Sequence, residues 1–185
     1  MRLEGLRVAL LVEDGFEDLE LWVTAMRLQE EGAPVTLLGQ ESGHSYRSKS
    51  GGLKAKADRA GSEVRADDFD ALVVPGGWAP DRLRRYEWVK SLVRTMHGQG
   101  KPIGLICHAG LVGISAGIVA GRRATGSLGI KDDLVNAGAT WVDAPALRDG
   151  NLIWGRVVED IPDFCRELVS AFEAERARTA ASAAR

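Results

Sequence analysis

The stretch Gly104-Leu105-Ile106-Cys107-His108-Ala109-Gly110 decides both the fold and the site. The apolar run 103–106 predicts a buried strand, and the Gly/Ala-rich segment after it predicts a helix. A sharp strand-to-helix turn holds a nucleophile clear of the sheet and points the free amides of the helix at the atom under attack. Because a helix N-terminus favours negative charge, we expect Cys107 to ionise more readily than a free thiol.

A buried core position is the competing interpretation of Cys107, because free cysteine usually packs as a small hydrophobe. His108 shifts the balance, since a histidine is a poor core filler and suits a site that holds a thiolate. The pair Cys107-His108 is therefore the leading candidate for nucleophilic chemistry.

Composition excludes several classes of protein. With 24 basic and 26 acidic residues among 185, the net charge of -2 gives no electrostatic reason to expect a nucleic acid or membrane partner. The apolar run 8–12 is stopped by Glu13 and Asp14, which argues against a secretory signal, and we expect a cytoplasmic protein. Its two cysteines, Cys107 and Cys165, are not expected to form a disulfide in that reducing compartment.

Four apolar runs without strict alternation predict strands buried on both faces, at 6–12, 35–38, 71–74 and 103–106. Between the first two runs, a helix is predicted with a buried apolar stripe of Leu19, Trp22, Val23 and Met26. Strand, helix and strand in this order indicate a parallel sheet.

The remaining segments complete a single domain. Loops and a small hairpin are expected over 40–58, and further helices near 88–96, 111–118, 131–136 and 164–172. Strands 140–142 and 152–154 are expected to pair around a turn at Asp149-Gly150. We predict one doubly wound, mostly parallel α/β domain over 1–173, followed by a frayed tail over 174–185.

Ligands of open α/β sheets bind outside the carboxyl ends of the strands, where three segments are expected to converge. After the first strand comes Glu17, which either reaches the pocket or caps the following helix; its spacing from Asp14 favours capping. After the third strand come Gly76 and Gly77, which either form a plain turn or present backbone N–H groups to an oxyanion.

Asp81 has two interpretations, as a residue that orients a histidine or as a helix cap. His44 and His97 have no partners at metal-ligand spacing, so we predict no metal site. The sequence contains no glycine-rich phosphate fingerprint, and we expect no cofactor.

Taken together, the motifs resemble those of the ThiJ/PfpI superfamily, in particular its PfpI-like intracellular proteases and stress proteins. The resemblance covers nearly the whole chain and rests on the segments 15–21, 69–77, 79–81, 100–102, 106–108, 114–117, 121–123, 130–133 and 136–139. It implies a fold of the flavodoxin-like or class I glutamine amidotransferase-like type.

The resemblance also implies roles for single residues. Cys107 would be the nucleophile, His108 its neighbouring base and Glu17 a carboxyl close to the sulfur. Asp81 would complete the triad from an adjacent subunit, so that the active form is a homodimer or a larger ring. Gly76 and Gly77 match the oxyanion-hole segment.

The chain departs from the family pattern at three places. Ala109-Gly110 stands where the family reads Gly-Pro, which affects the pocket wall and places Ala109 among the substrate-binding candidates. Trp78 replaces a polar residue at the pocket entrance, and Gly155 stands where a serine is usual.

Three functions compete on this basis. The first is an intracellular peptidase-like hydrolase with a cysteine nucleophile, active in stress protection. The second is a glyoxalase or deglycase that acts on methylglyoxal or its protein adducts, which Trp78 favours by narrowing the pocket for a small carbonyl compound. The third is a non-enzymatic redox sensor or chaperone that uses oxidation of Cys107.

Overall fold

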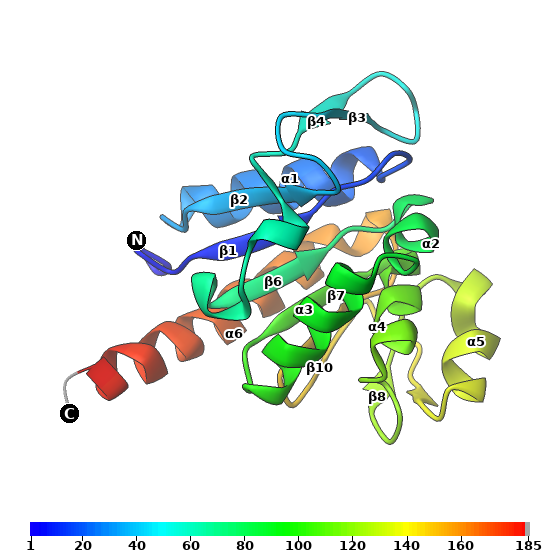
Figure 1. The fold of residues 1–185 in the computed structure, drawn as a ribbon. Helices are drawn as coiled ribbons and strands as arrows, with labels where there is room; N and C mark the ends of the chain where they lie inside the picture. The colour runs from blue at the N-terminus through cyan, green and yellow to red at the C-terminus, as the bar shows by residue number, and fades with distance from the viewer. Residues whose placement is uncertain (184–185) are drawn as a thin grey trace.

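Seven strands form the central sheet in the computed structural model, which describes residues 1–183 (Figure 1). Six of them run parallel and the edge strand β10 runs antiparallel to β11. From one edge to the other the strands are β10 (Ala146–Asp149), β11 (Leu152–Gly155), β7 (Ile103–Ile106), β6 (Ala71–Val74), β1 (Val8–Leu11), β2 (Val35–Gly39) and β5 (Arg59–Ala60).

Helices cover both faces of this sheet, with α3 and α4 on one face and α1 and α6 on the other (Figure 1). Short 3₁₀ turns connect several elements. The six helices of the described part of the chain are α1 (Asp18–Glu30), α2 (Ala79–Leu83), α3 (Glu87–Gly98), α4 (Gly110–Ala116), α5 (Lys131–Asn136) and α6 (Ile161–Ala183). The doubly wound, mostly parallel architecture expected from the sequence is confirmed.

Two small sheets lie outside the central one. The hairpin expected within 40–58 is present as β3 (Ser45–Arg47) and β4 (Lys54–Lys56), while β8 (Arg123–Ala124) pairs in parallel with β9 (Thr140–Trp141). The predicted pairing of 140–142 with 152–154 is therefore wrong. The partner of β11 across the turn is the half-buried edge strand β10, whose Leu-Arg-Asp sequence carries only a weak strand signal.

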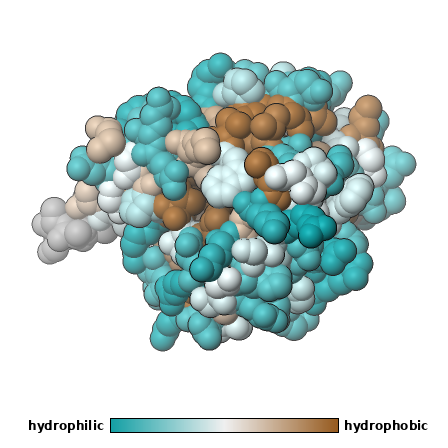
Figure 2. Space-filling view, turned by 90° about the horizontal axis from the view of Figure 1, so that it is seen from above, coloured by the Kyte–Doolittle hydropathy of each residue, from teal (hydrophilic) through white to brown (hydrophobic). Residues whose placement is uncertain are grey.

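Of the four residues in the apolar stripe predicted for α1, Trp22 packs against the core, whereas the other three are exposed. Leu19, Val23 and Met26 are 48%, 39% and 60% exposed, and the buried face carries polar side chains, Glu20 and Thr24, beside its apolar ones. Figure 2 shows an elongated band of apolar side chains and smaller, separate apolar areas on the face seen from above, among largely hydrophilic neighbours. The helix thus presents an apolar surface to the outside and brings a carboxyl group into the core.

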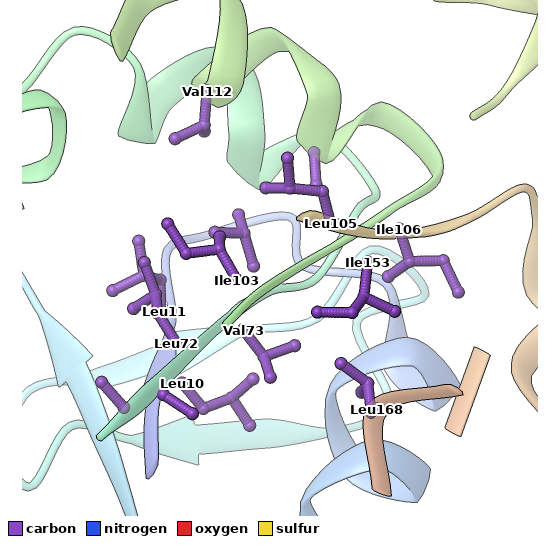
Figure 3. Close-up of a cluster of buried hydrophobic side chains, with 14 of the residues drawn as sticks. Leu10, Leu11, Leu72, Val73, Ile103, Leu105, Ile106, Val112, Ile153 and Leu168 are labelled. Atoms are coloured by element: carbon purple, nitrogen blue, oxygen red, sulfur yellow. The ribbon is translucent and has the colours of Figure 1, made fainter. Parts of the chain in front are cut away.

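The core is a layer of aliphatic side chains on each face of the central strands (Figure 3). All residues of β1, β6 and β7 are buried, because a parallel strand covered on both faces has no polar side. Leu168 of α6 packs against one face and Val112 of α4 against the other (Figure 3). This packing fixes the positions of the strand ends that carry the site.

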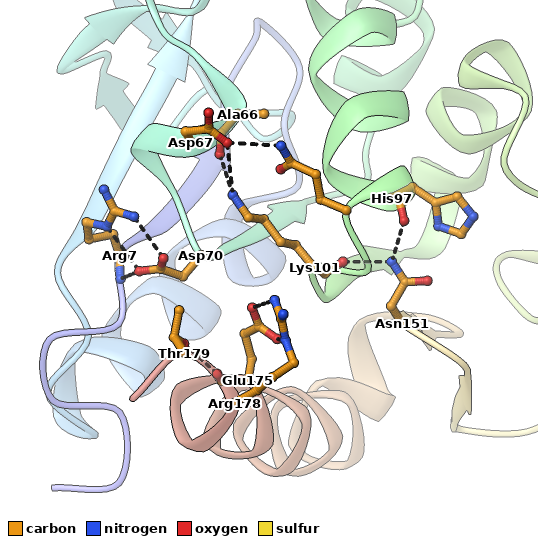
Figure 4. A network of polar contacts seen from close by, with 11 residues as sticks. Arg7, Ala66, Asp67, Asp70, His97, Lys101, Asn151, Glu175, Arg178 and Thr179 are labelled. Carbon is orange, nitrogen blue, oxygen red and sulfur yellow. Dashed lines mark hydrogen bonds and ion pairs between the residues drawn. The ribbon is translucent and has the colours of Figure 1, made fainter. Parts of the chain in front are cut away.

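Polar contacts hold the amino ends of the strands together (Figure 4). Arg7, just before β1, binds Asp70, just before β6, with an Nη2–Oδ1 distance of 2.8 Å. Asn151 donates from Nδ2 to the backbone carbonyl of Lys101, just before β7, at 2.8 Å. Although burial opposes ionisation, the hydrogen bonds from Arg7 keep the pKa of Asp70 below its usual value. These contacts fix the amino ends of the strands, and the pocket of Cys107 lies at their carboxyl ends.

The C-terminal helix is longer than the sequence indicated. Residues 174–183, expected to fray, continue α6, whereas 184 and 185 lie outside the described residues. Glu175 is 6% exposed and binds Arg178, and Arg176 donates to the backbone carbonyl of Arg2. These contacts give the polar segment partners that its composition does not reveal. Along residues 1–183, no helix is long and apolar enough to cross a membrane.

Candidate active site

Cys107 stands at a strained turn between β7 and α4. Its φ of 60° is the only positive value of a non-glycine residue among residues 1–183. This conformation costs an L-amino acid about 1–2 kcal/mol, so neighbouring contacts have to hold it. The backbone N–H of Ser127 donates to the Cys107 carbonyl at 3.1 Å, and a Cβ at Gly126 would lie only 2.8 Å from that oxygen. The predicted elbow is present, and a close backbone approach secures it.

The carboxyl group beside the sulfur belongs to Glu20. Its side chain is fully buried, accepts a hydrogen bond from the Gly76 N–H at 2.7 Å, and interacts with the Cys107 side chain. The expectation that Glu17 fills this place is corrected. Glu17 is the N-cap of α1, where its Oε2 accepts from the N–H groups of Leu19 and Glu20 at 2.8 and 2.9 Å. Glu17 thus caps α1 as predicted, but as the N-cap itself and not as the partner of Asp14 in a capping box, because Asp14 accepts the Arg47 N–H. Glu17 also lines the pocket.

Burial shifts the titration of both groups. It raises the pKa of the Cys107 thiol to about 12, with the negative charge of Glu20 as the next cause. It also raises the pKa of Glu20 to about 7, while the hydrogen bond from Gly76 opposes that shift. The expected easy ionisation of Cys107 is therefore wrong for this state of the site. Because two negative charges are costly in one desolvated space, the Cys107 thiol keeps its proton at neutral pH.

Two backbone N–H groups, those of Gly77 and His108, hydrogen-bond the sulfur and favour its ionised form. Gly76, predicted to serve beside Gly77 as an oxyanion donor, instead donates its N–H to Glu20. Neither glycine leaves room for a side chain. A Cβ at Gly76 would overlap Glu20 Oε2, and one at Gly77, where φ is +78°, would overlap the carbonyl oxygen of Gly15.

His108 lies where a base for the thiol is needed. Its Nδ1 is 3.2 Å from the Cys107 Sγ. Burial and the positive charge of Lys49 lower the pKa of His108, so the neutral ring is able to accept a proton. Asp81 is not brought to this histidine within the chain: it lies in α2, its exposed carboxyl pairs with Arg85, and it is not among the pocket-lining residues.

The pocket in front of the sulfur has a volume of about 250 Å³. Trp78, 63% exposed, stands at its mouth, and the Lys49 Nζ lies 5.9 Å from the centre of the Trp78 ring. Ala109 is fully buried and does not line the pocket, which corrects its predicted role as a substrate contact. The pocket is lined by Glu17, Glu20, Lys49, Gly77, Trp78, Cys107, His108, Ser127, Val157, Val158 and Glu159.

Six of these residues were not among the predicted site residues: Glu20, Lys49, Ser127, Val157, Val158 and Glu159. For Glu20 a signal existed, because it precedes Leu21 and lies four residues before Thr24, so all three share the buried side of α1. Lys49 and Ser127 lie in irregular segments, and Glu159 follows β11 after a connecting loop. Their positions depend on tertiary contacts for which the sequence carries no periodic signal.

The glycine at position 155 has a packing explanation. A Cβ there would lie 2.9 Å from two ring atoms of Phe164 and 3.0 Å from Ile106 Cδ1. The Phe164 ring of α6 thus occupies the space of a serine side chain. This departure changes the core beneath the site rather than the nucleophile. Within residues 1–183, no group of three or more His, Cys, Asp or Glu side chains is arranged to hold a metal ion.

Known proteins are similar to this chain in sequence and in fold. The model of the DJ-1/PfpI family matches residues 6–171. A deglycase of Pyrococcus abyssi is 43% identical over 169 residues, which cover 89% of this chain and 98% of that protein. A putative cysteine protease of Bacillus subtilis, YraA, is 37% identical, with coverage of 89% and 96%.

A crystal structure from Anabaena variabilis, of a two-domain protein with DJ-1/ThiJ/PfpI-like and ferritin-like domains, matches with a TM-score of 0.87 and 36% identity. The match covers 89% of this chain and 47% of that longer one. The flavodoxin-like, class I glutamine amidotransferase-like architecture is confirmed. On the match across residues 6–171 and the identity to these relatives, the chain belongs to the DJ-1/PfpI family.

Proposed function

We propose that this protein is a cysteine-dependent hydrolase that acts on small carbonyl compounds and their adducts, as a deglycase or glyoxalase. One observation carries the proposal: the Cys107 side chain interacts with the buried carboxyl group of Glu20, and its sulfur lies 3.2 Å from the Nδ1 of His108. The deglycase of Pyrococcus abyssi, which is 43% identical, supports the same activity.

The geometry supplies each proton that the reaction needs. His108 takes the thiol proton as the sulfur attacks an aldehyde carbon, and the protonated Glu20 gives its proton to the oxygen that becomes a hydroxyl. The N–H groups of Gly77 and His108, which hydrogen-bond the sulfur, stabilise the negative charge on the thiolate that makes the attack. On a methylglyoxal adduct of an amine, formation of the hemithioacetal at Cys107 releases the amine.

The second half of the reaction restores the thiol. Proton transfer from the hydroxyl-bearing carbon to the neighbouring carbonyl carbon turns the hemithioacetal into a lactoyl thioester. Water then hydrolyses the thioester, which gives lactate and the free Cys107. No external oxidant is required, because one carbon of the substrate is oxidised while its neighbour is reduced.

Peptide hydrolysis is the second candidate function. It uses the same nucleophile and base, and the putative cysteine protease of Bacillus subtilis supports it. The pocket of about 250 Å³ favours the smaller substrate, because Trp78 stands at the mouth where a peptide would have to pass.

Oxidation of Cys107 in a stress sensor is a third function. It is supported by Glu20, whose proton is placed to hydrogen-bond an oxidised sulfur. Its pKa of about 7 means that this donor is present below neutral pH and is progressively lost above it. The buried Cys165, whose sulfur contacts Thr24 Oγ1, offers an internal reference thiol for oxidation experiments.

We also propose that the protein works in the cytoplasm as a homodimer or larger ring. Both cysteines are free thiols, which suits a reducing compartment. The exposed stripe of Leu19, Val23 and Met26 on α1 is a surface that a second copy would cover. In such an assembly, the Asp81 carboxylate of one copy would leave its ion pair with Arg85 and bind His108 of another copy.

The test compares wild type with Cys107→Ala and, as matched control, Cys165→Ala. Methylglyoxal loss, lactate formation, amine release from a methylglyoxal-modified arginine derivative and cleavage of a fluorogenic peptide are measured in parallel. We expect Cys107→Ala to abolish lactate formation and amine release, and Cys165→Ala to retain them. Equal activity of wild type and Cys107→Ala on every substrate would refute cysteine catalysis, and peptide cleavage without lactate formation would favour the peptidase.

A further inference from the structure

A second hollow, of about 510 Å³, adjoins the pocket of Cys107. It lies where the β3–β4 hairpin meets the loop after β1 and helix α2. The two hollows share Lys49 and Trp78, which stand at the boundary between them. A ligand that reaches the sulfur therefore has a neighbouring space into which a longer portion can extend.

The second hollow is strongly cationic. Arg47, Lys49 and Arg82 line it, and none of the three side chains forms an ion pair within residues 1–183. Its single carboxylate, that of Asp14, accepts the backbone N–H of Arg47 at 2.8 Å. Three cations against one carboxylate concentrate positive charge here, although the whole chain carries a net charge of -2.

Backbone contacts fix the hairpin strand that bears Arg47 and Lys49. The Lys49 N–H donates to the Phe16 carbonyl at 2.7 Å, and the Gly15 N–H donates to the Arg47 carbonyl at 2.8 Å. The hairpin strand is thus fastened to the loop that leads into α1. Because that loop also carries Glu17 and is followed by Glu20, the backbone that bears Arg47 and Lys49 has a fixed position relative to the reacting sulfur.

We propose that the second hollow binds the phosphate group of a substrate whose carbonyl carbon lies at Cys107. A phosphate monoester is a dianion and neutralises the excess charge of Arg47, Lys49 and Arg82. Guanidinium groups match phosphate oxygens with paired N–H donors, and Lys49 adds a point charge at the boundary. The carbonyl end of this substrate rests on the proposed function, whereas the phosphate end rests on the hollow alone. The substrate class is a small phosphorylated carbonyl compound.

Binding is measured separately from catalysis, by calorimetry at low ionic strength with glycerol 3-phosphate and glycerol as a matched pair of probes. The proteins are wild type, Cys107→Ala, Arg47→Gln, Arg82→Gln and the control Lys131→Gln, which removes an exposed cation of α5 outside the hollow. We expect glycerol 3-phosphate to bind and glycerol not to bind. Arg47→Gln and Arg82→Gln should each weaken binding about tenfold, since each removes a charge-assisted hydrogen bond.

Competition with catalysis gives an independent readout. Glycerol 3-phosphate should inhibit methylglyoxal turnover by wild type and by Lys131→Gln equally, with a weaker inhibition constant in Arg47→Gln. Equal binding of the two probes, or equal losses in Lys131→Gln and Arg47→Gln, would overturn the phosphate site. Binding to Cys107→Ala that matches wild type supports it even if no protein turns over methylglyoxal, so failure of the proposed function remains distinguishable. Thermal unfolding checks that each variant is folded.

Discussion

Replacing Glu20 with glutamine tests the influence of its carboxyl group on the ionisation of the Cys107 thiol. The variant keeps the size of the side chain and the acceptor for the Gly76 N–H but removes the negative charge that opposes ionisation of Cys107. We therefore expect the pKa of Cys107 to fall. A glutamine N–H also donates to a thiolate, which acts in the same direction.

The size of the fall follows from the environment of the pair. Two unit charges about 4 Å apart interact by about 4 kcal/mol at an effective dielectric constant of about 20, which sets an upper limit of about 3 pKa units. Burial, the larger cause of the raised value, persists in the variant. We expect a fall of about 1 to 2 units from the wild-type value of about 12.

The assay is the pH dependence of alkylation by iodoacetamide, read at Cys107 by mass spectrometry, with Cys165 as internal reference. Glu159→Gln is the matched control, because it removes a pocket-lining carboxyl that is not a cause of the Cys107 shift. At pH 8 the Glu20→Gln protein should react about 10- to 100-fold faster than wild type. An unchanged or higher pKa of Cys107 in Glu20→Gln, or an equal fall in Glu159→Gln, would refute the reasoning.

Three further predictions concern stability. The folded protein holds the Glu20 proton up to about pH 7, whereas the unfolded chain loses it near pH 4.5. The free energy of unfolding should therefore fall by about 3 kcal/mol as the pH rises from 4.5 to 7. Glu20→Gln should reduce this dependence of the unfolding free energy on pH, as measured by urea titration. Gly77→Ala should lower the unfolding free energy by at least about 2 kcal/mol and abolish activity, because its Cβ meets the Gly15 carbonyl; normal melting would contradict this. Gly155→Ser should lower the free energy of unfolding by about 1–3 kcal/mol, because its side chain clashes with Phe164; thermal melting would show this. Iodoacetamide should still alkylate Cys107 in this variant.

The sequence predicted the central strands well, because their signal is local. Runs such as 71–74 and 103–106 are apolar throughout, and the structure places strands at these same residues. The edge strand Ala146–Asp149 was missed because its residues are only half-buried and alternate weakly. Helix α4 ends at Ala116, before Gly117, whose φ of 74° suits a C-cap, although the apolar spacing continued to Ile118.

The site was predictable where it follows the chain and not where it depends on packing. Cys107 and His108 are neighbours in sequence, so the elbow could be inferred. The choice between Glu17 and Glu20 depends on which face of α1 is buried, and the apolar Leu19 and Val23 pointed to the opposite face. Whether a cysteine ionises readily depends on desolvation and on a nearby carboxylate, neither of which the helix terminus alone reveals.

The β3–β4 hairpin has a consequence for the diversification of this architecture. It forms its own two-stranded sheet and shares no ladder with the strand that ends at the nucleophile. Exchange of its tip, residues 50–53, therefore alters the shape met by an incoming molecule, while Lys49, which lines the pocket of Cys107 and acts on His108, is kept. Selectivity can thus be varied apart from reactivity, and laboratory libraries restricted to these four positions should yield enzymes of new substrate preference with the same catalytic residues.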